Sequence, residues 1–215
     1  MGWAAKEAAK YAWKNLSWLQ EADEATAIQL ISTAHERTSG EAAERGDGVH
    51  DSAETYVKGK PDGKNLKHMR QLEDFFEVSQ YEPLFTEVTV VNRTIGYAGT
   101  ADLIAADPHK GCVLIDYKTG NGVYPEHLIQ VEALSRAEFI LTPEGEEIVV
   151  PTIFSVGVLH LRPLSWWFYL NADGSSSERN WQAFLSAKGV ADWRRLHPAM
   201  VFGPLEKMNR RNWAA

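Results

Sequence analysis

The stretch GTADLIAADPHKGCVLIDYKTG, residues 99–120, decides the fold of this chain. Apolar residues fill the segments ADLIAAD and CVLIDYK, and the turn sequence DPHKG separates them, so we expect two strands that follow one another. The run VLI at 113–115 is apolar on both faces, which is typical of a central strand that is covered on both sides. Each predicted strand also carries an aspartate, Asp102 in the first and Asp116 in the second.

Outward from this stretch, the sequence predicts both helices and strands. Residues 3–58 are rich in alanine and glutamate, with apolar residues at helical spacing, and we expect Gly40 and the GDG at 46–48 to interrupt this helical region. The other expected elements are helices over 65–79, 125–141 and 177–196 and strands over 84–92, 97–107, 112–118, 154–163 and 165–171. Residues 144–151 are expected to form a turn and a short strand.

The order of these elements predicts a single α/β or α+β domain with a mixed sheet, and we favour an α/β domain in which helices flank a central mixed sheet. The domain spans residues 1–215, with a mainly helical part over 1–80 and a sheet core with a C-terminal helix over 83–215. No linker that is long enough to divide two domains interrupts the sequence.

The composition restricts the function. The formal net charge of -7 is not the simple signature of a nucleic-acid-binding protein, which usually carries a basic balance. Cys112 is the one cysteine, so neither an internal disulfide nor a cysteine-bound zinc or iron–sulfur site is expected. There is no transmembrane-length apolar run and no apolar segment of a secretory signal near residue 1. We therefore expect an intracellular protein without a membrane partner.

The sequence DYK at 116–118 ends the predicted central strand with two charges on one face. Side chains alternate along a strand, so Asp116 and Lys118 point the same way and Tyr117 points away. If the two strands are neighbours, Asp102 can meet Asp116, and paired carboxylates bind a hard divalent cation. A lysine beside such an ion is suited to phosphodiester hydrolysis. The alternative for Asp116 and Lys118 is a surface ion pair without a catalytic role.

Four motifs together carry a resemblance to a known family. RGDGVHDSAE at 45–54, GTADLI at 99–104, VLIDYKTG at 113–120 and HLIQVEAL at 127–134 resemble the RecB-like, CRISPR-associated-exonuclease-like branch of the PD-(D/E)XK nucleases. VLHLRP at 158–163 is similar to phage-type members. The resemblance implies a restriction-endonuclease-like core with a central mixed sheet between helices.

The resemblance also implies a role for individual residues. The implied metal ligands are His50, Asp102, Asp116 and the backbone carbonyl of Tyr117, and the implied catalytic residues are Lys118, Asp116, Asp102 and Gln130. These residues imply Mg²⁺- or Mn²⁺-dependent hydrolysis of DNA, by an exonuclease rather than an endonuclease. The implied setting is recombination, repair or phage DNA metabolism in the cytoplasm of a bacterial or phage-infected cell. A homo-oligomer or a recombination partner protein fits that setting.

The chain departs from the family in two respects. Leu134 stands where the family usually has a tyrosine, five positions along a motif that starts at Gln130, so the handling of DNA is expected to differ. Several relatives bind an iron–sulfur cluster through four cysteines, and this sequence has one, so no such cluster is expected.

Further residues are candidates for support of the site or for contact with DNA. Glu87 lies in the predicted strand upstream of Asp102, and Glu54 lies one helical turn after His50, so both can support a metal site. The candidates for contact with DNA are Lys58, Lys60, Lys64, Lys67, Arg70 and Tyr124. A solvated surface is the alternative for the basic residues, and for Glu54 it is the favoured reading.

Two other functions remain open from the sequence. The same fold can hold DNA ends or a partner protein without cutting, and the net acidity and Leu134 favour this non-catalytic module. A plain interaction protein is the second alternative. It predicts no divalent-metal site and therefore no stabilisation of the fold by metal.

Overall fold

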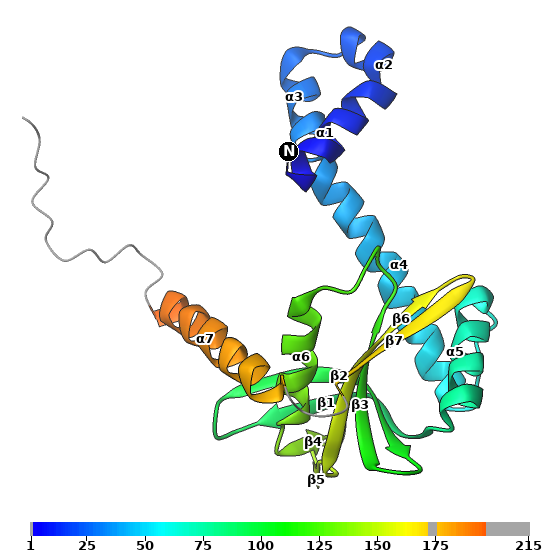
Figure 1. Cartoon of the computed structure of the whole chain (residues 1–215). Coiled ribbons are helices and arrows are strands. Elements are labelled where there is room, and N and C mark those ends of the chain that lie inside the picture. The colour runs from blue at the N-terminus through cyan, green and yellow to red at the C-terminus, as the bar shows by residue number, and fades with distance from the viewer. Residues whose placement is uncertain (1, 172–175, 197–215) are drawn as a thin grey trace, which may run out of the picture.

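The computed structural model of the chain describes residues 2–171 and 176–196, within which there are seven helices and seven strands (Figure 1). The helices are α1 (Trp3–Lys14), α2 (Leu16–Glu21), α3 (Glu24–Ser32), α4 (Ala34–Val57), α5 (Leu66–Ser79), α6 (Pro125–Ser135) and α7 (Ser177–Leu196). The strands are β1 (Glu82–Asn92), β2 (Tyr97–Asp107), β3 (Gly111–Lys118), β4 (Phe139–Leu141), β5 (Glu147–Val149), β6 (Ile153–Arg162) and β7 (Ser165–Asn171).

The seven strands form one mixed sheet in the order β5-β4-β1-β2-β3-β6-β7. Strands β3 and β6 are parallel, and every other neighbouring pair is antiparallel. The chain crosses from β3 to β6 through α6 and the short hairpin β4–β5. The prediction of a central mixed sheet flanked by helices, with a helical N-terminal region, is confirmed.

Two apolar cores lie on the two faces of the sheet. On one face, α4 and α5 pack through residues such as Ala53 and Leu72 against alternate residues of β2 and β3. On the other face, α6 packs through Val131 and Leu134 against the intervening residues of the same strands. The run 113–115 at the centre of β3 is fully buried, which confirms the prediction of a central strand covered on both sides.

Two expectations about element boundaries are wrong. The helix expected over 125–141 ends at Ser135, and Phe139–Leu141 forms β4 instead, paired with residues 89–91 of β1. A short apolar run such as FIL fits a strand or a helix equally well, and here pairing with the edge of β1 makes it a strand.

Helix α4 is continuous through Gly40 and through residues 46–48, where an interruption was expected. A Cβ added at Gly40 would meet nothing within 4 Å, and at Gly46 or Gly48 it would make only ordinary van der Waals contacts. A Cβ at Gly46 would meet the Thr119 hydroxyl at 3.5 Å, and one at Gly48 would meet the Asn65 amide at 3.9 Å. Asn65 Nδ2 also donates to the Gly48 carbonyl at 2.7 Å, which ties the helix to the loop before α5.

Helices α1–α3 lie apart from the sheet, at the far end of α4 (Figure 1). None of their residues is buried. Helix α1 meets the first half of α4, where the Arg37 guanidinium stacks 4.7 Å from the centre of the Tyr11 ring. Within the described ranges, no helix has both the length and the apolar character that a membrane span requires.

Candidate metal centre

The pairing of β1, β2 and β3 brings three acidic residues into one row. Thr86 pairs with Leu103 and Val88 with Ala101, so Glu87 lies opposite Asp102. Leu103 pairs with Ile115, and continuation of that register sets Asp102 opposite Asp116. The sequence motifs therefore meet at one place because the strands that carry them are neighbours in the sheet.

Helix α4 adds His50 to this row. Val49 and Ala53 are buried against the sheet, so the helix face between them is held over β1 and β2. His50 Nδ1 lies 3.5 Å from Glu87 Oε1 and 3.4 Å from Asp102 Oδ2. His50, Glu87 and Asp102 each offer one ligand atom, and these atoms lie within 4.8 Å of one another.

These spacings suit a divalent cation. An octahedral ion with ligands at about 2.1 Å keeps adjacent ligands about 3 Å apart, which small side-chain movements achieve here. Glu87 Oε1 supplies a second argument, because it is buried and accepts no hydrogen bond from any described residue. A buried carboxylate oxygen without a donor is costly, and a bound cation removes that cost. The donor set therefore fits a metal ion.

The backbone of Glu87 is strained in a way that favours this site. Its φ is +50°, in the left-handed region that residues other than glycine rarely adopt. Such strain costs about 1–3 kcal/mol and concentrates at functional sites, where it re-aims a side chain. The strained backbone and the orphan oxygen are two independent features of one residue.

His50 is oriented by the backbone of β3. Its Nε2 lies 3.1 Å from the carbonyl oxygen of Tyr117, which fixes Nε2–H as the donor and turns Nδ1 toward the carboxylates. Burial lowers the pKa of His50, but the nearby carboxylates of Asp102 and Glu87, at 3.4 and 3.5 Å from Nδ1, outweigh it and raise the pKa to about 10. A proton on Nδ1 thus stands where a cation can bind.

Asp102 is held by two strands. Its Oδ2 accepts a hydrogen bond of 2.6 Å from the backbone N–H of Tyr117 in β3. Its backbone carbonyl accepts one of 3.0 Å from the Thr86 hydroxyl in β1. The first bond fixes the carboxylate before any ion arrives and the second fixes the backbone that carries it, so little ordering entropy is lost on binding.

Asp116 and Lys118 lie on one face of β3, as predicted. Lys118 Nζ is 2.6 Å from Asp116 Oδ2, in an ion pair without hydrogen-bond geometry. Burial raises the pKa of the Asp116 carboxyl, the Asp102 charge adds to this and Lys118 opposes it, which leaves the pKa at about 6. Asp116 is buried, whereas the Lys118 side chain is 23% exposed, so the pair opens to solvent through its ammonium group.

The cluster differs in two respects from the implied ligand set. Glu87, expected only as a supporting residue, contributes one of the three clustered ligand atoms, and Asp116 is not among them. The Tyr117 carbonyl contacts His50. Because a carbonyl oxygen has two lone pairs, ligation by this group stays a prediction, as does ligation by Asp116.

The remaining candidates lie outside the cluster. Glu54 forms an ion pair of 2.5 Å with Lys58. Gln130 is exposed on α6, and no hydrogen bond or ion pair joins it to any residue within the described ranges. Tyr124 is 55% exposed just before α6. The exposed basic residues of the segment after α4 are Lys58, Lys60, Lys64, Lys67 and Arg70.

Leu134 belongs to the core rather than to the surface of the site. It is buried with α6 against β2, and a Cβ at Gly99 would lie only 2.7 Å from Leu134 Cδ2. Gly99 therefore leaves the space that this side chain fills. Leu134 itself is too deeply buried to contact a bound macromolecule.

The turn after Lys118 is held by residues that sequence reasoning did not select. His160 Nε2 lies 2.8 Å from the Gly120 carbonyl oxygen, and Arg162 donates to the carbonyl oxygens of Thr119, at 3.1 Å, and of Gly120. Both side chains come from β6, the parallel neighbour of β3. His160 and Arg162 are two residues apart in VLHLRP, so the sequence predicts that they share one face of a strand. The sequence does not reveal that this strand lies next to the site.

Comparisons with known proteins leave the family open. A scan of protein-family models found none that matches this chain, and no curated protein was similar enough in sequence to count as a relative.

Proposed function

We propose that this protein is a divalent-metal-dependent deoxyribonuclease, and within that class an exonuclease. One observation carries the proposal: His50, Glu87 and Asp102 converge from α4, β1 and β2 beside the Asp116–Lys118 pair of β3. The resemblance of the four sequence motifs to RecB-like nucleases supports DNA as the substrate. The coarser property, a cluster that can hold a metal ion, does not depend on that resemblance.

The ligands would be His50 Nδ1, Glu87 Oε1 and Asp102 Oδ2, with Asp116 as a further candidate. Two carboxylates suit Mg²⁺ or Mn²⁺, and the imidazole nitrogen suits Mn²⁺ better than Mg²⁺. When bound, the ion supplies an acidified water and neutralises charge on a phosphate.

The chain's own residues account for the rest of the chemistry. Tyr117 orients two ligands through its backbone, the carbonyl facing His50 and the N–H bonded to Asp102. Lys118 presents a cation beside the cluster that can stabilise negative charge on a phosphate. Asp116 anchors that ammonium group.

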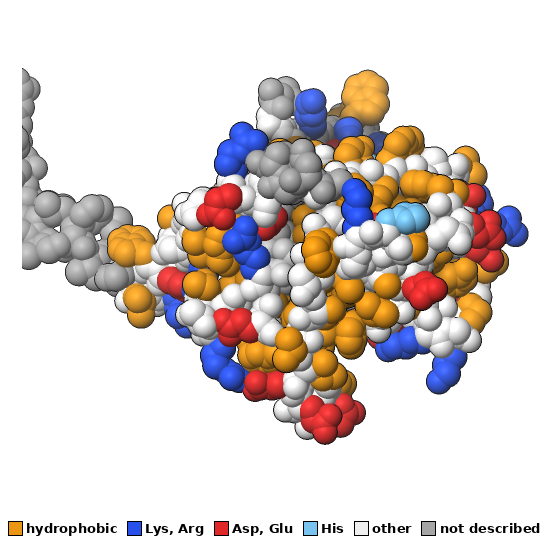
Figure 2. Space-filling view, turned by 60° about the horizontal axis from the view of Figure 1, so that its bottom comes forward, with side chains coloured by type: hydrophobic (Ala, Val, Ile, Leu, Met, Phe, Trp, Pro, Cys, Tyr) orange, Lys and Arg blue, Asp and Glu red, His pale blue; other side chains and the backbone are white. Residues whose placement is uncertain are grey.

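Contact with DNA has to be local, because the chain is acidic overall. On the face in Figure 2, basic side chains are scattered among acidic ones and form no continuous patch. The segment from Lys58 to Arg70 directly follows α4, the helix that carries His50, and its five basic residues are exposed. We assign to this segment the contacts with the phosphate backbone of DNA. Recombination, repair or phage DNA metabolism in the cytoplasm, with self-association or a partner protein, is the setting that the resemblance supports.

The experiment is a cleavage time course on linear DNA that is labelled at the 5′ or the 3′ end, with Mg²⁺, Mn²⁺ or EDTA. Circular DNA distinguishes an exonuclease from an endonuclease. Lys118→Ala is the test variant, and Lys110→Ala is its control, because Lys110 is exposed at the opposite end of β3. We expect metal-dependent release of label by the wild type and by Lys110→Ala, and at least a 100-fold loss in Lys118→Ala.

Two negative outcomes have different meanings. Metal binding without cleavage of any substrate would reject the nuclease function and favour a non-catalytic DNA-binding or protein-interaction module. The absence of both metal binding and cleavage would reject the assignment of the site itself.

A further inference from the structure

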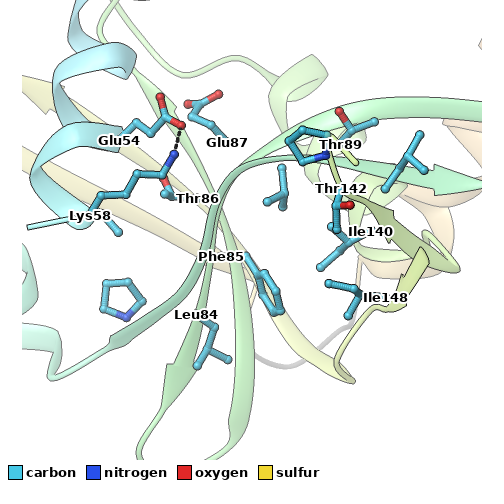
Figure 3. A pocket seen from close by; sticks show the side chains of 15 residues that line it. Glu54, Lys58, Leu84, Phe85, Thr86, Glu87, Thr89, Ile140, Thr142 and Ile148 are labelled. Atoms are coloured by element: carbon cyan, nitrogen blue, oxygen red, sulfur yellow. Dashed lines mark hydrogen bonds and ion pairs between the residues drawn. The ribbon is translucent and has the colours of Figure 1, made fainter. Parts of the chain in front are cut away.

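A cavity of about 570 Å³ lies beside the metal cluster and shares one residue with it. Glu87 lines this cavity, and its Oε1 is one of the three clustered ligand atoms. Figure 3 shows Glu87 at the upper end of the cavity near Glu54, with Phe85 and Leu84 below it and Ile140, Thr142 and Ile148 on the opposite side. Whatever occupies the cavity is thus adjacent to an ion held by Glu87.

The cavity exists because β4 is short. Strand β4 pairs with β1 only at residues 89–91, and the chain then turns at 142–146. Among the described residues, no strand pairs with 82–88 of β1 on the side away from β2. Residues 83–89 line the cavity, so a strand edge with unpaired N–H and C=O groups borders it.

The walls are mainly apolar and incompletely covered. The larger apolar side chains of these walls include Leu84, Phe85, Val88, Ile140, Leu141 and Ile148. Leu84 is 47% exposed and Ile148 is 40% exposed, so large apolar side chains from both walls remain open to a ligand. An aromatic ring and branched aliphatic groups beside backbone donors and acceptors suit a flat heterocycle with polar edges.

Charge is confined to the mouth. Among the lining residues the charged ones are Glu54, Lys58 and Glu87, and the first two neutralise one another in an ion pair. A phosphate is therefore excluded from the apolar interior and is accommodated at the metal cluster. A neutral base in the cavity with its phosphate outside satisfies both requirements.

We propose that this cavity binds one unpaired base of the DNA strand whose phosphate lies at the His50–Glu87–Asp102 cluster. The inference rests on the proposed function and deepens it. The volume of about 570 Å³ is in the range of small-ligand pockets. A base enters such a pocket only when it has left its pair and its stack, so the strand must be single or frayed where it is cut. The enzyme then prefers single-stranded DNA and the ends of duplexes over duplex interiors.

The test compares two neighbouring residues of β5. Ile148 lines the cavity, whereas Val149 is 80% exposed and does not line it. We expect the wild type and Val149→Glu to cleave a labelled single strand about 10-fold faster than the same sequence in a blunt duplex, as loss of one stacked base implies. In Ile148→Glu this preference is lost. Equal preferences in the two variants would overturn the proposal.

A second variant and a binding assay separate this proposal from the nuclease assignment. Leu84→Glu alters the opposite wall, and it gives the same loss if the cavity, rather than the folding of β5, is responsible. Binding is measured with Ca²⁺ in the Lys118→Ala background, using a labelled decathymidine with a single 2-aminopurine. We expect the 2-aminopurine fluorescence to change at one position along the strand, and Ile148→Glu to abolish the change.

The two proposals fail in different ways. If the wild type cuts no DNA, but binds single strands in a way that Ile148→Glu abolishes and Val149→Glu does not, the base-binding cavity is supported and the nuclease proposal is rejected. If the wild type cuts single strands and duplexes at equal rates, the nuclease proposal is supported and the base-binding cavity is rejected.

Discussion

The two halves of helix α4 share one continuous backbone but lie in different surroundings. Residues 41–45 in the first half are all exposed, whereas Val49 and Ala53 in the second half are buried against the sheet. Only the second half carries a residue of the metal cluster, His50. The comparison teaches that a polar helix acquires a chemical role where the sheet fixes its side chains, and not through its composition.

The largest effect separates the two histidines of α4. His50→Ala removes a ligand and leaves Glu87 and Asp102 without the group between them, so we expect metal affinity to fall about 10–100-fold and cleavage at least 100-fold. His35 lies in the first half, where its Nδ1 is 2.9 Å from the Ser32 carbonyl oxygen. His35→Ala is expected to change both quantities less than twofold. Calorimetric titration with Mn²⁺ and a cleavage assay measure them.

Equal behaviour of the two variants would remove the distinction between the halves. A loss of cleavage in His50→Ala without a loss of metal affinity would assign His50 to another role at the site.

A smaller effect separates two alanines of the same helix. Ala53 is fully buried in the core that α4 and α5 share with the sheet, whereas Ala43 is exposed. We expect Ala53→Leu to lower the free energy of unfolding by about 1–3 kcal/mol through overpacking, and Ala43→Leu to change it by less than about 0.5 kcal/mol. Urea denaturation monitored by tryptophan fluorescence compares them. A tolerated Ala53→Leu would mean that the helix does not pack closely on the sheet.

Much of the fold was predictable from the sequence because its signals are local. Residues 97–107 and 112–118 alternate or are apolar on both faces, with a strong turn signal between them, so both strands were predicted nearly to their ends. The adjacency of Asp116 and Lys118 follows from strand geometry alone. The packing of α4 on the sheet, by contrast, depends on contacts with residues far along the chain.

The ligand position of Glu87, which the sequence had indicated only as a supporting residue, depended on such long-range features. Glu87 is one glutamate within an alternating strand, and nothing local reveals its positive φ or its place opposite Asp102. The helix expected over 125–141 was too long for a similar reason, since the pairing of β4 with β1 is decided by the sheet. Sequence therefore predicted the residues of β2 and β3 better than the partner that β1 contributes.

The pH dependence of metal binding sharpens the contrast around His50. Its pKa is raised from 6.5 to about 10, so the protonated ring stabilises the metal-free fold fully below pH 6.5, and this contribution is lost as the pH rises through 10. A metal ligand must be neutral, so binding between these values releases a proton. We expect affinity for Mn²⁺ to rise about 10-fold per pH unit over this range, which is about 1.4 kcal/mol.

Calorimetry at pH 7.5 in two buffers of different ionisation enthalpy measures the proton count directly. We expect about one proton released per ion. A count of zero, with an affinity that does not vary with pH, would exclude His50 Nδ1 as a ligand even if the ion binds.

The smallest effect concerns Gly40, in the exposed half of α4. The helix is continuous there, and a Cβ added at Gly40 would meet nothing within 4 Å. Alanine in a helix interior is favoured over glycine, so Gly40→Ala is expected to raise the free energy of unfolding by about 0.5–1 kcal/mol. Gly46→Ala is the comparison in the other half, where the new Cβ would lie in ordinary van der Waals contact with the Thr119 hydroxyl at 3.5 Å, so a gain of similar size is expected. Destabilisation by Gly40→Ala would mean that the helix is interrupted at this glycine, as the sequence alone had suggested.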